Sequence, residues 1–176
     1  MFKTVRAGAE DLSRRMPWKL MVAGAFVAGV FGIIALTGAR ATPPTPPPGF
    51  VSTSIVGPVV MDEIHTVHQT ADYGVMIKSR GLSDVYVTHI RIAPGGNGGW
   101  HSHPGPSVIT VRAGVATFYD ECNDFEPQRY PVGTGFVEDA ECVHLLANEG
   151  DVDLEVVVIQ IVPRGAPRRI DEPAPF

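Results

Sequence analysis

Three histidines in two separate parts of the chain have the residue type and spacing of a metal site. His101 and His103 flank a serine, and His144 lies in a later apolar run. In a β-strand, residues i and i+2 point to the same face, so His101 and His103 would project together. His144 needs only to lie opposite them on another strand. Three neutral imidazoles suit Fe, Ni, Cu or Zn, and the spacing therefore predicts one bound divalent metal ion.

The segments that must position these histidines read as short β-strands. From Ile55 onward, apolar runs rich in β-branched and aromatic residues alternate with turn residues, at a spacing typical of sandwiches and barrels. No segment here carries a convincing helical stripe. The expected strands cover residues 55–61, 75–78, 85–92, 107–111, 115–119, 135–137, 143–146 and 153–162. The sequence therefore predicts an all-β fold, a sandwich or a barrel.

The alternation of side chains along a strand also predicts what lines the cavity. Counting by twos from His103 brings Ser107 and Ile109 to the inner face, and counting from His144 brings Asn148 to it. These three residues are the expected cavity lining. By the same parity, Trp100 should face outward as a packing residue.

Conformationally special residues stand at regular distances from the histidines. A glycine lies six residues before His101 and another eleven after His103, while a glycine precedes His144 and an asparagine follows it by four. In this register the region 84–162 resembles the two motifs of the cupin superfamily, through Gly95, His101, His103, Gly114, Gly133, His144 and Asn148. The resemblance implies a small double-stranded β-helix of the cupin, or jelly-roll, kind over residues 51–165.

The sequence departs from the cupin pattern at several positions. The glutamate that usually serves as a ligand falls on Ser107, a poor ligand for divalent metals, and the proline and glycine of the second motif fall on Asp139 and Glu141. A three-histidine site is therefore expected, with positions left for water, substrate or oxygen. The sequence offers no credible acid or base residue near it, and the only polar candidates beside the metal are Ser107, Asn148 and Tyr119.

Two functions compete at this level. The first is a mononuclear metal oxygenase acting on a small molecule, because some cupin-like dioxygenases use a three-histidine centre. The second is a binding module of the cell envelope that captures a small ligand or a metal without chemistry. The residues do not separate Fe, Mn, Ni, Cu and Zn, and iron is our first expectation. Cupin relatives often dimerise through strand edges, so the resemblance also suggests a homodimer.

The N-terminus has the pattern of an export device. An uninterrupted uncharged run, Leu20–Leu36, follows a basic stretch and precedes a small-x-small sequence at residues 39–41. A signal peptide cleaved after Ala41 and a retained helical membrane anchor both fit residues 1–41. Ser13-Arg14-Arg15 also resembles a twin-arginine signal, although an ordinary basic region explains it as well. Every alternative places the barrel outside the cytoplasm.

The remaining segments and the charge complete the expected organisation. Residues 42–50 are rich in proline and read as a semi-rigid spacer, and residues 166–176 read as a C-terminal tail. The net charge is −5, and the basic residues are concentrated towards the N-terminus. Because the body is more acidic still, it should repel phosphate backbones, and nucleic-acid binding is not expected.

The chain has two cysteines, Cys122 and Cys142. An exported domain meets oxidising conditions, in which the two would form a disulfide. Two unpaired thiols, or a Cys142 that binds the metal, are the alternatives at this level.

Overall fold

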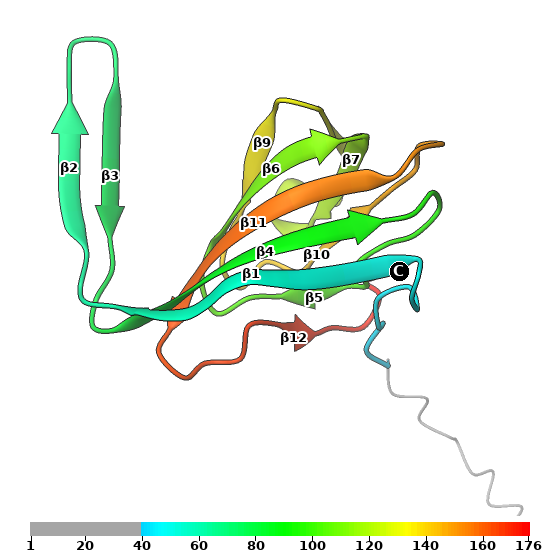
Figure 1. Ribbon diagram of the computed structural model, residues 1–176, viewed down its shortest axis with the longest axis horizontal. Helices are drawn as coiled ribbons and strands as arrows, with labels where there is room; N and C mark the ends of the chain where they lie inside the picture. The colour runs from blue at the N-terminus through cyan, green and yellow to red at the C-terminus, as the bar shows by residue number, and fades with distance from the viewer. Residues whose placement is uncertain (1–39) are drawn as a thin grey trace, which may run out of the picture. The chain divides into compact units, whose positions relative to one another are not determined.

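Turn residues divide the described part of the chain, residues 40–176 of a computed structural model, into short strands (Figure 1). The strands are β1 (Phe50–Met61), β2 (His65–Gln69), β3 (Gly74–Lys78), β4 (Ser83–Ile92), β5 (His101–Ser102), β6 (Ser107–Ala113), β7 (Val115–Asp120), β8 (Gln128–Pro131), β9 (Gly135–Glu138), β10 (His144–Ala147), β11 (Leu154–Pro163) and β12 (Ile170–Asp171). A 3-10 turn, η1 (Glu121–Asn123), follows β7. The all-β prediction is confirmed for these residues.

The strands form two five-stranded antiparallel sheets. The first sheet has the order β1-β4-β11-β6-β9 and the second the order β12-β5-β10-β7-β8. Buried and more exposed residues alternate along β6 and β11 because one face of each strand looks into the molecule. The core between the sheets is made of Ile92, Ile109, Val111, Ala116, Leu146, Leu154, Val156 and Val158. The sheets therefore form a β-sandwich around one apolar interior.

One hairpin within the expected barrel belongs to neither sheet. Strands β2 and β3 pair only with each other, from His65↔Lys78 to Gln69↔Gly74. Every residue of both strands is exposed, and Figure 1 shows the hairpin as a separate arm. The predicted barrel of residues 51–165 is thus interrupted by an insertion between β1 and β4.

The proline-rich segment 42–50, predicted to be a semi-rigid spacer, is hydrogen-bonded to the rest of the fold. The Thr42 hydroxyl accepts a hydrogen bond from the Trp100 backbone N–H at 2.8 Å, and Thr45 exchanges bonds with Asn97 through both its backbone and its side chain. Gly99 has a φ of 68°, and a Cβ there would collide with the Thr42 carbonyl. The composition did not predict this attachment, because the threonines between the prolines supply hydrogen bonds that a polyproline spacer lacks.

The C-terminal segment 166–176 is not a tail, because it completes the second sheet. Ile170 and Asp171 pair with Ser102 and His101 of β5, and the Thr42 backbone N–H donates to Glu172. The final residue, Phe176, lies edge-on to Trp100 at a ring distance of 5.6 Å. A strand of two residues is too short to leave a pattern in the sequence, so this pairing was not predicted.

Among residues 40–176, no helix is long and apolar enough to span a membrane. The Leu20–Leu36 run and the helix expected for it lie outside the described residues.

Candidate metal centre

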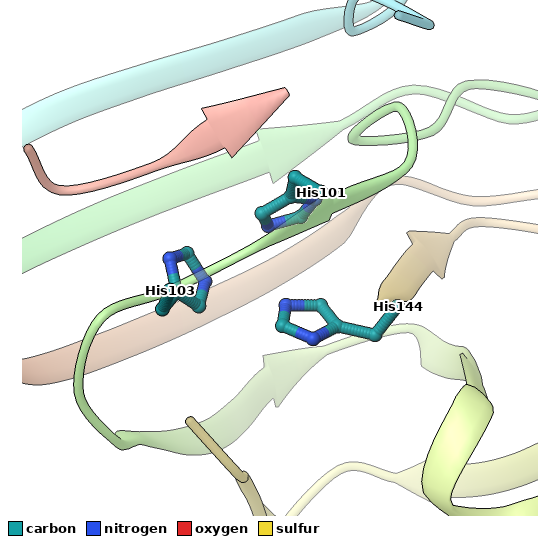
Figure 2. A group of neighbouring side chains, drawn as sticks. All are labelled: His101, His103 and His144. Atoms are coloured by element: carbon teal, nitrogen blue, oxygen red, sulfur yellow. The ribbon is translucent and has the colours of Figure 1, made fainter. Parts of the chain in front are cut away.

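The three predicted histidines converge inside the sandwich, on the second sheet. His101 on β5 and His144 on β10 are register partners, and His103 follows β5 directly. The ring centroids lie 4.5 to 4.9 Å apart, and all three side chains are buried. Figure 2 shows the rings facing one another across the space between the two strands. One nitrogen of each ring lies within 4.8 Å of the corresponding nitrogens of the other two.

A backbone carbonyl fixes the orientation of each ring. The Nδ1 atoms of His101, His103 and His144 lie 2.8, 2.7 and 2.8 Å from the carbonyl oxygens of Gly99, Arg168 and Cys142. Because a carbonyl only accepts, the Nδ1 atoms of His101 and His144 carry the hydrogen. The Nδ1 of His103 also lies 2.9 Å from the side-chain amide nitrogen of Gln160, so two neighbours hold this ring. The Nε2 atoms of His101 and His144 are therefore left with free lone pairs, and ligands of a metal are commonly held in this way.

Burial keeps two of the rings neutral. Desolvation is the main cause that lowers the pKa of His101 from 6.5 to about 2, and the nearby His144, Arg169 and His103 act in the same direction. Desolvation also lowers the pKa of His144, although the charge of Glu138 opposes this shift. Neutral imidazoles are the form that binds a metal ion.

A buried carboxylate that sequence reasoning missed completes the cluster. The Oε2 atom of Glu138 lies 3.2 Å from the Nε2 of His103 and 3.7 Å from the Nε2 of His144, and its side chain is 5% exposed. Glu138 is the last residue of β9, directly opposite Ser107 of β6. The expectation that Ser107, Asn148 and Tyr119 are the only polar candidates near the metal is therefore wrong. A glutamate followed by Asp139 in an acidic turn gave no signal that distinguished it from a surface residue.

Of the three residues expected to line a cavity beside the histidines, only Ile109 does so. Ser107 is completely buried on the same inner face, but it is not part of the lining. Asn148 is outside the cavity, because β10 ends at Ala147 and the alternation stops there. Its side-chain amide instead donates to the carbonyls of Ile92 and Val152 and accepts from Gly150, which holds a turn.

The histidine cluster lies at a cavity of about 230 Å³. The walls combine the polar residues of the cluster with a larger apolar surface. The lining includes His101, His103, Glu138, Gln160, Arg168, Arg169, Phe50, Ile90, Ile109, Leu146 and Val158. A small molecule in this cavity would contact His101, His103 and the apolar walls together.

The other histidines and the two aromatic candidates lie apart from the centre. His65 and His68 are exposed on β2, and His89 contacts Glu155 at 3.2 Å. Trp100 is an outward packing residue, as parity predicted, against Tyr119 and Phe125. Tyr119, which the sequence suggested as a polar residue near the metal, instead donates a hydrogen bond to Glu149.

Cys122 and Cys142 form a disulfide whose Cα atoms lie 5.9 Å apart. Neither cysteine is free among the described residues. Cys142 lies two residues before His144, and its carbonyl accepts a hydrogen bond from the His144 ring. The disulfide therefore stabilises the segment that orients one of the three histidines.

Comparison with known proteins relates this region to a family. Residues 88–160, from within β4 to within β11, match the family model described as the cupin domain. This part of the chain is therefore similar to a cupin domain. No curated protein matches the sequence at a significant level.

Solved structures with a similar fold come from several bacteria. They include a conserved protein of unknown function from Streptococcus pyogenes, with 18% identity, 66% of this chain and 76% of that chain covered, and a TM-score of 0.44. A cupin superfamily protein from Desulfitobacterium hafniense has 12% identity, coverages of 65% and 78%, and a TM-score of 0.44. The cupin domain of an XRE family transcriptional regulator from Enterobacter cloacae has 14% identity, coverages of 66% and 99%, and a TM-score of 0.45.

Proposed function

We propose that this cupin domain binds one divalent metal ion through His101, His103, His144 and Glu138, and that the chain is a metal-dependent enzyme acting on a small molecule in the adjoining cavity. The observation that carries the proposal is the fixed orientation of the three rings. The Nδ1 atoms of His101 and His144 are committed to carbonyls, so their Nε2 lone pairs are free, and the ring of His103 is held beside them by Arg168 and Gln160. Within residues 40–176, the buried Nε2 of His144 has no hydrogen-bond partner, and such an atom is costly unless something binds it.

The position of Glu138 fits a fourth ligand. Its carboxylate lies 3.2 and 3.7 Å from two Nε2 atoms, and a cation bound between these atoms would balance the negative charge of the carboxylate. Two ligand atoms bound about 2.1 Å from one ion lie about 3.0 to 3.4 Å apart at the usual bond angles. Three imidazoles and one carboxylate form a donor set suited to Fe, Mn, Ni, Cu or Zn.

The cavity favours an enzyme over a metal carrier. When bound, a divalent ion polarises a coordinated oxygen or lowers the pKa of a bound water. The apolar walls, among them Phe50, Ile90 and Val158, exclude water from the same space. A protein that only stored a metal would have no use for an apolar cavity beside it, whereas a small substrate would be held against the ion there.

Metal content of the full chain tests this function. We expect about one ion per chain in the wild type and in His68→Gln, which alters an exposed histidine on β2. His144→Gln should lose the ion, and Glu138→Gln should bind it at least about ten-fold more weakly, since even indirect partners of metal ligands change affinity by about 10–100-fold. Metal-free wild-type protein after reconstitution with each candidate metal, or full occupancy in His144→Gln, would contradict the proposal.

An oxygenase remains the kind of enzyme that we propose first. The identity of the bound metal tests this choice. Oxygen chemistry needs a redox-active ion, so we expect Fe, Mn, Ni or Cu to be the metal bound in the producing cell. Zinc at full occupancy in the purified full chain, with no iron, manganese, nickel or copper, would overturn the oxygenase while leaving a metal-dependent hydrolytic or lyase reaction.

We also propose that the chain acts outside the cytoplasm, either released or membrane-anchored. The apolar Leu20–Leu36 run and the Cys122–Cys142 disulfide support this location, because disulfides persist in oxidising compartments. Fractionation of the producing cells, followed by alkylation without reductant, tests it. Two labelled thiols in protein recovered from the cytoplasm would contradict it.

A further inference from the structure

A cationic side chain from the C-terminal segment lies at the cavity of the histidine cluster. Arg169 immediately precedes β12, whose pairing with β5 places it beside the segment that carries His101 and His103. Its Nε donates to the carboxylate of Asp171. Its Nη2 is buried and, among the described residues, has no hydrogen-bond partner. A buried donor of a charged group is costly to leave unpaired, so this nitrogen is ready for an acceptor from a ligand.

The neighbouring Arg168 differs from Arg169, because its side chain is hydrogen-bonded within the protein. Arg168 also borders the cavity, but its Nε donates to Gln160 at 3.0 Å and its Nη2 donates to Thr88 at 2.7 Å. Its guanidinium lies 4.4 Å from the centre of the Tyr86 ring. Arg168 is therefore held in place by the protein, and its carbonyl orients His103. Arg169 is the arginine of this pair with a buried donor to spare.

The charges around the cavity determine which kind of ligand it would bind. A bound divalent ion and Arg169 both carry positive charge, and Glu138 and Asp171 together offset only part of it. A negative group between the ion and the guanidinium would be stabilised by both. Arg168 and Gln160 also border the cavity, but their side chains are hydrogen-bonded within the protein. The ligand should therefore carry one anionic end and a short apolar body.

We propose that the substrate of this site is a small monocarboxylate, whose carboxylate is bound by Arg169 at the metal and whose apolar body packs against the walls formed by Phe50, Ile90 and Val158. The metal end of this arrangement rests on the proposed function. The contribution of Arg169 does not, because its buried Nη2 is present in the chain whether or not an ion is bound. The two can therefore fail separately.

Calorimetric titration of the full chain with butyrate tests the proposal, with butyramide as the neutral analogue of the same shape and inorganic phosphate as an anion without an apolar body. Each is measured on metal-loaded and chelator-treated protein. We expect butyrate to bind at least about ten-fold more tightly than either analogue. Arg169→Gln should weaken butyrate binding about ten-fold or more without changing metal content. Arg129→Gln, which removes an exposed arginine that pairs with Glu149, should leave butyrate binding unchanged.

The outcomes separate the metal centre from the carboxylate site. If the chain binds no metal but butyrate still binds Arg169→Gln more weakly than the wild type, the metal centre fails and the carboxylate site stands. Equal binding of butyrate and butyramide, tighter binding of phosphate than of butyrate, unchanged binding in Arg169→Gln, or no detectable binding of butyrate would each overturn the carboxylate proposal. Circular dichroism of Arg169→Gln and a conservative Arg169→Lys variant show whether a loss reflects unfolding. A folded Arg169→Lys that retains part of the affinity supports the proposal.

Discussion

Ser107 on β6 and Glu138 on β9 lie directly opposite each other across an antiparallel strand pair. Both are buried, and Ser107 stands where the cupin pattern has a glutamate. Directly opposed residues have Cβ atoms about 4.5–5.5 Å apart. A carboxylate on either strand can therefore reach the same region of the interior, and we propose that Glu138 takes the place of the carboxylate missing from the first motif.

This relationship predicts the effect of moving the carboxylate. Ser107→Glu alone should weaken metal binding, because two carboxylates would compete in a buried space. The exchange Ser107→Glu/Glu138→Ser should recover a substantial part of the affinity that Glu138→Ser loses. Competition with a chelator of known affinity measures the three variants. Ser107→Ala is the matched control and should bind as the wild type does, since within the described residues the Ser107 hydroxyl has no partner to lose.

A Ser107→Glu protein that binds metal more tightly than the wild type would contradict this account. It would mean that a ligand position was open and that Glu138 does not fill it.

The proline-rich segment should support the site through Thr42. Thr42→Val keeps the shape of the side chain but removes the acceptor of the Trp100 N–H. An unpaired buried donor costs about 1–3 kcal/mol, and Trp100 directly precedes His101. We expect a loss of unfolding free energy in this range and weaker metal binding. Thr53→Val, on the exposed part of β1, is the control for the substitution itself. A Thr42→Val protein as stable as this control would show that the segment is a spacer after all.

The sequence predicted the histidines well and their surroundings less well. His101, His103 and His144 stand in motifs whose spacing and strand parity survive in the fold, because local alternation is encoded by neighbouring residues. Glu138, Arg169 and the contacts of Thr42 depend on which strands become neighbours. Register between β6 and β9, or between β5 and β12, is set by packing of the whole sandwich, and strands of two to four residues carry too little pattern to reveal it.

Removal of the disulfide should affect both stability and metal binding. The cysteines are separated by 20 residues, and a closed loop of this size corresponds to about 3 kcal/mol in the chain-entropy estimate. Cys122→Ala/Cys142→Ala should lose about this free energy of unfolding in urea. Because the Cys142 carbonyl orients the His144 ring, metal affinity should also fall by about ten-fold. Lower stability with unchanged metal affinity would show that the bond fixes the loop but not the histidine.

The lowered pKa of His101 predicts how stability depends on pH when the metal has been removed. Above pH 6.5 the ring is neutral in both the folded and the unfolded chain, so its contribution to stability is complete. As the pH falls from 6.5 towards about 2, the unfolded chain takes up a proton that the folded chain does not. Stability should therefore fall by about 1.4 kcal/mol per pH unit from this group. The pKa of His144 is shifted in the same direction.

Urea unfolding of chelator-treated protein between pH 7 and pH 5 measures this dependence. His101→Gln cannot take up the proton, so its stability should fall less steeply with decreasing pH than that of the wild type. His68→Gln, which alters an exposed ring, should follow the wild type. Parallel curves for the wild type and His101→Gln would contradict the assignment of a neutral, buried His101.

Anomalous diffraction from crystals of the full chain, recorded at the absorption edge of the metal found by elemental analysis, tests the metal centre most directly. We expect one strong peak per chain, about 2.0–2.3 Å from the Nε2 atoms of His101, His103 and His144 and within bonding distance of a Glu138 oxygen. A metal-loaded protein whose peak lies elsewhere, or whose four side chains surround no peak, would contradict the proposed centre.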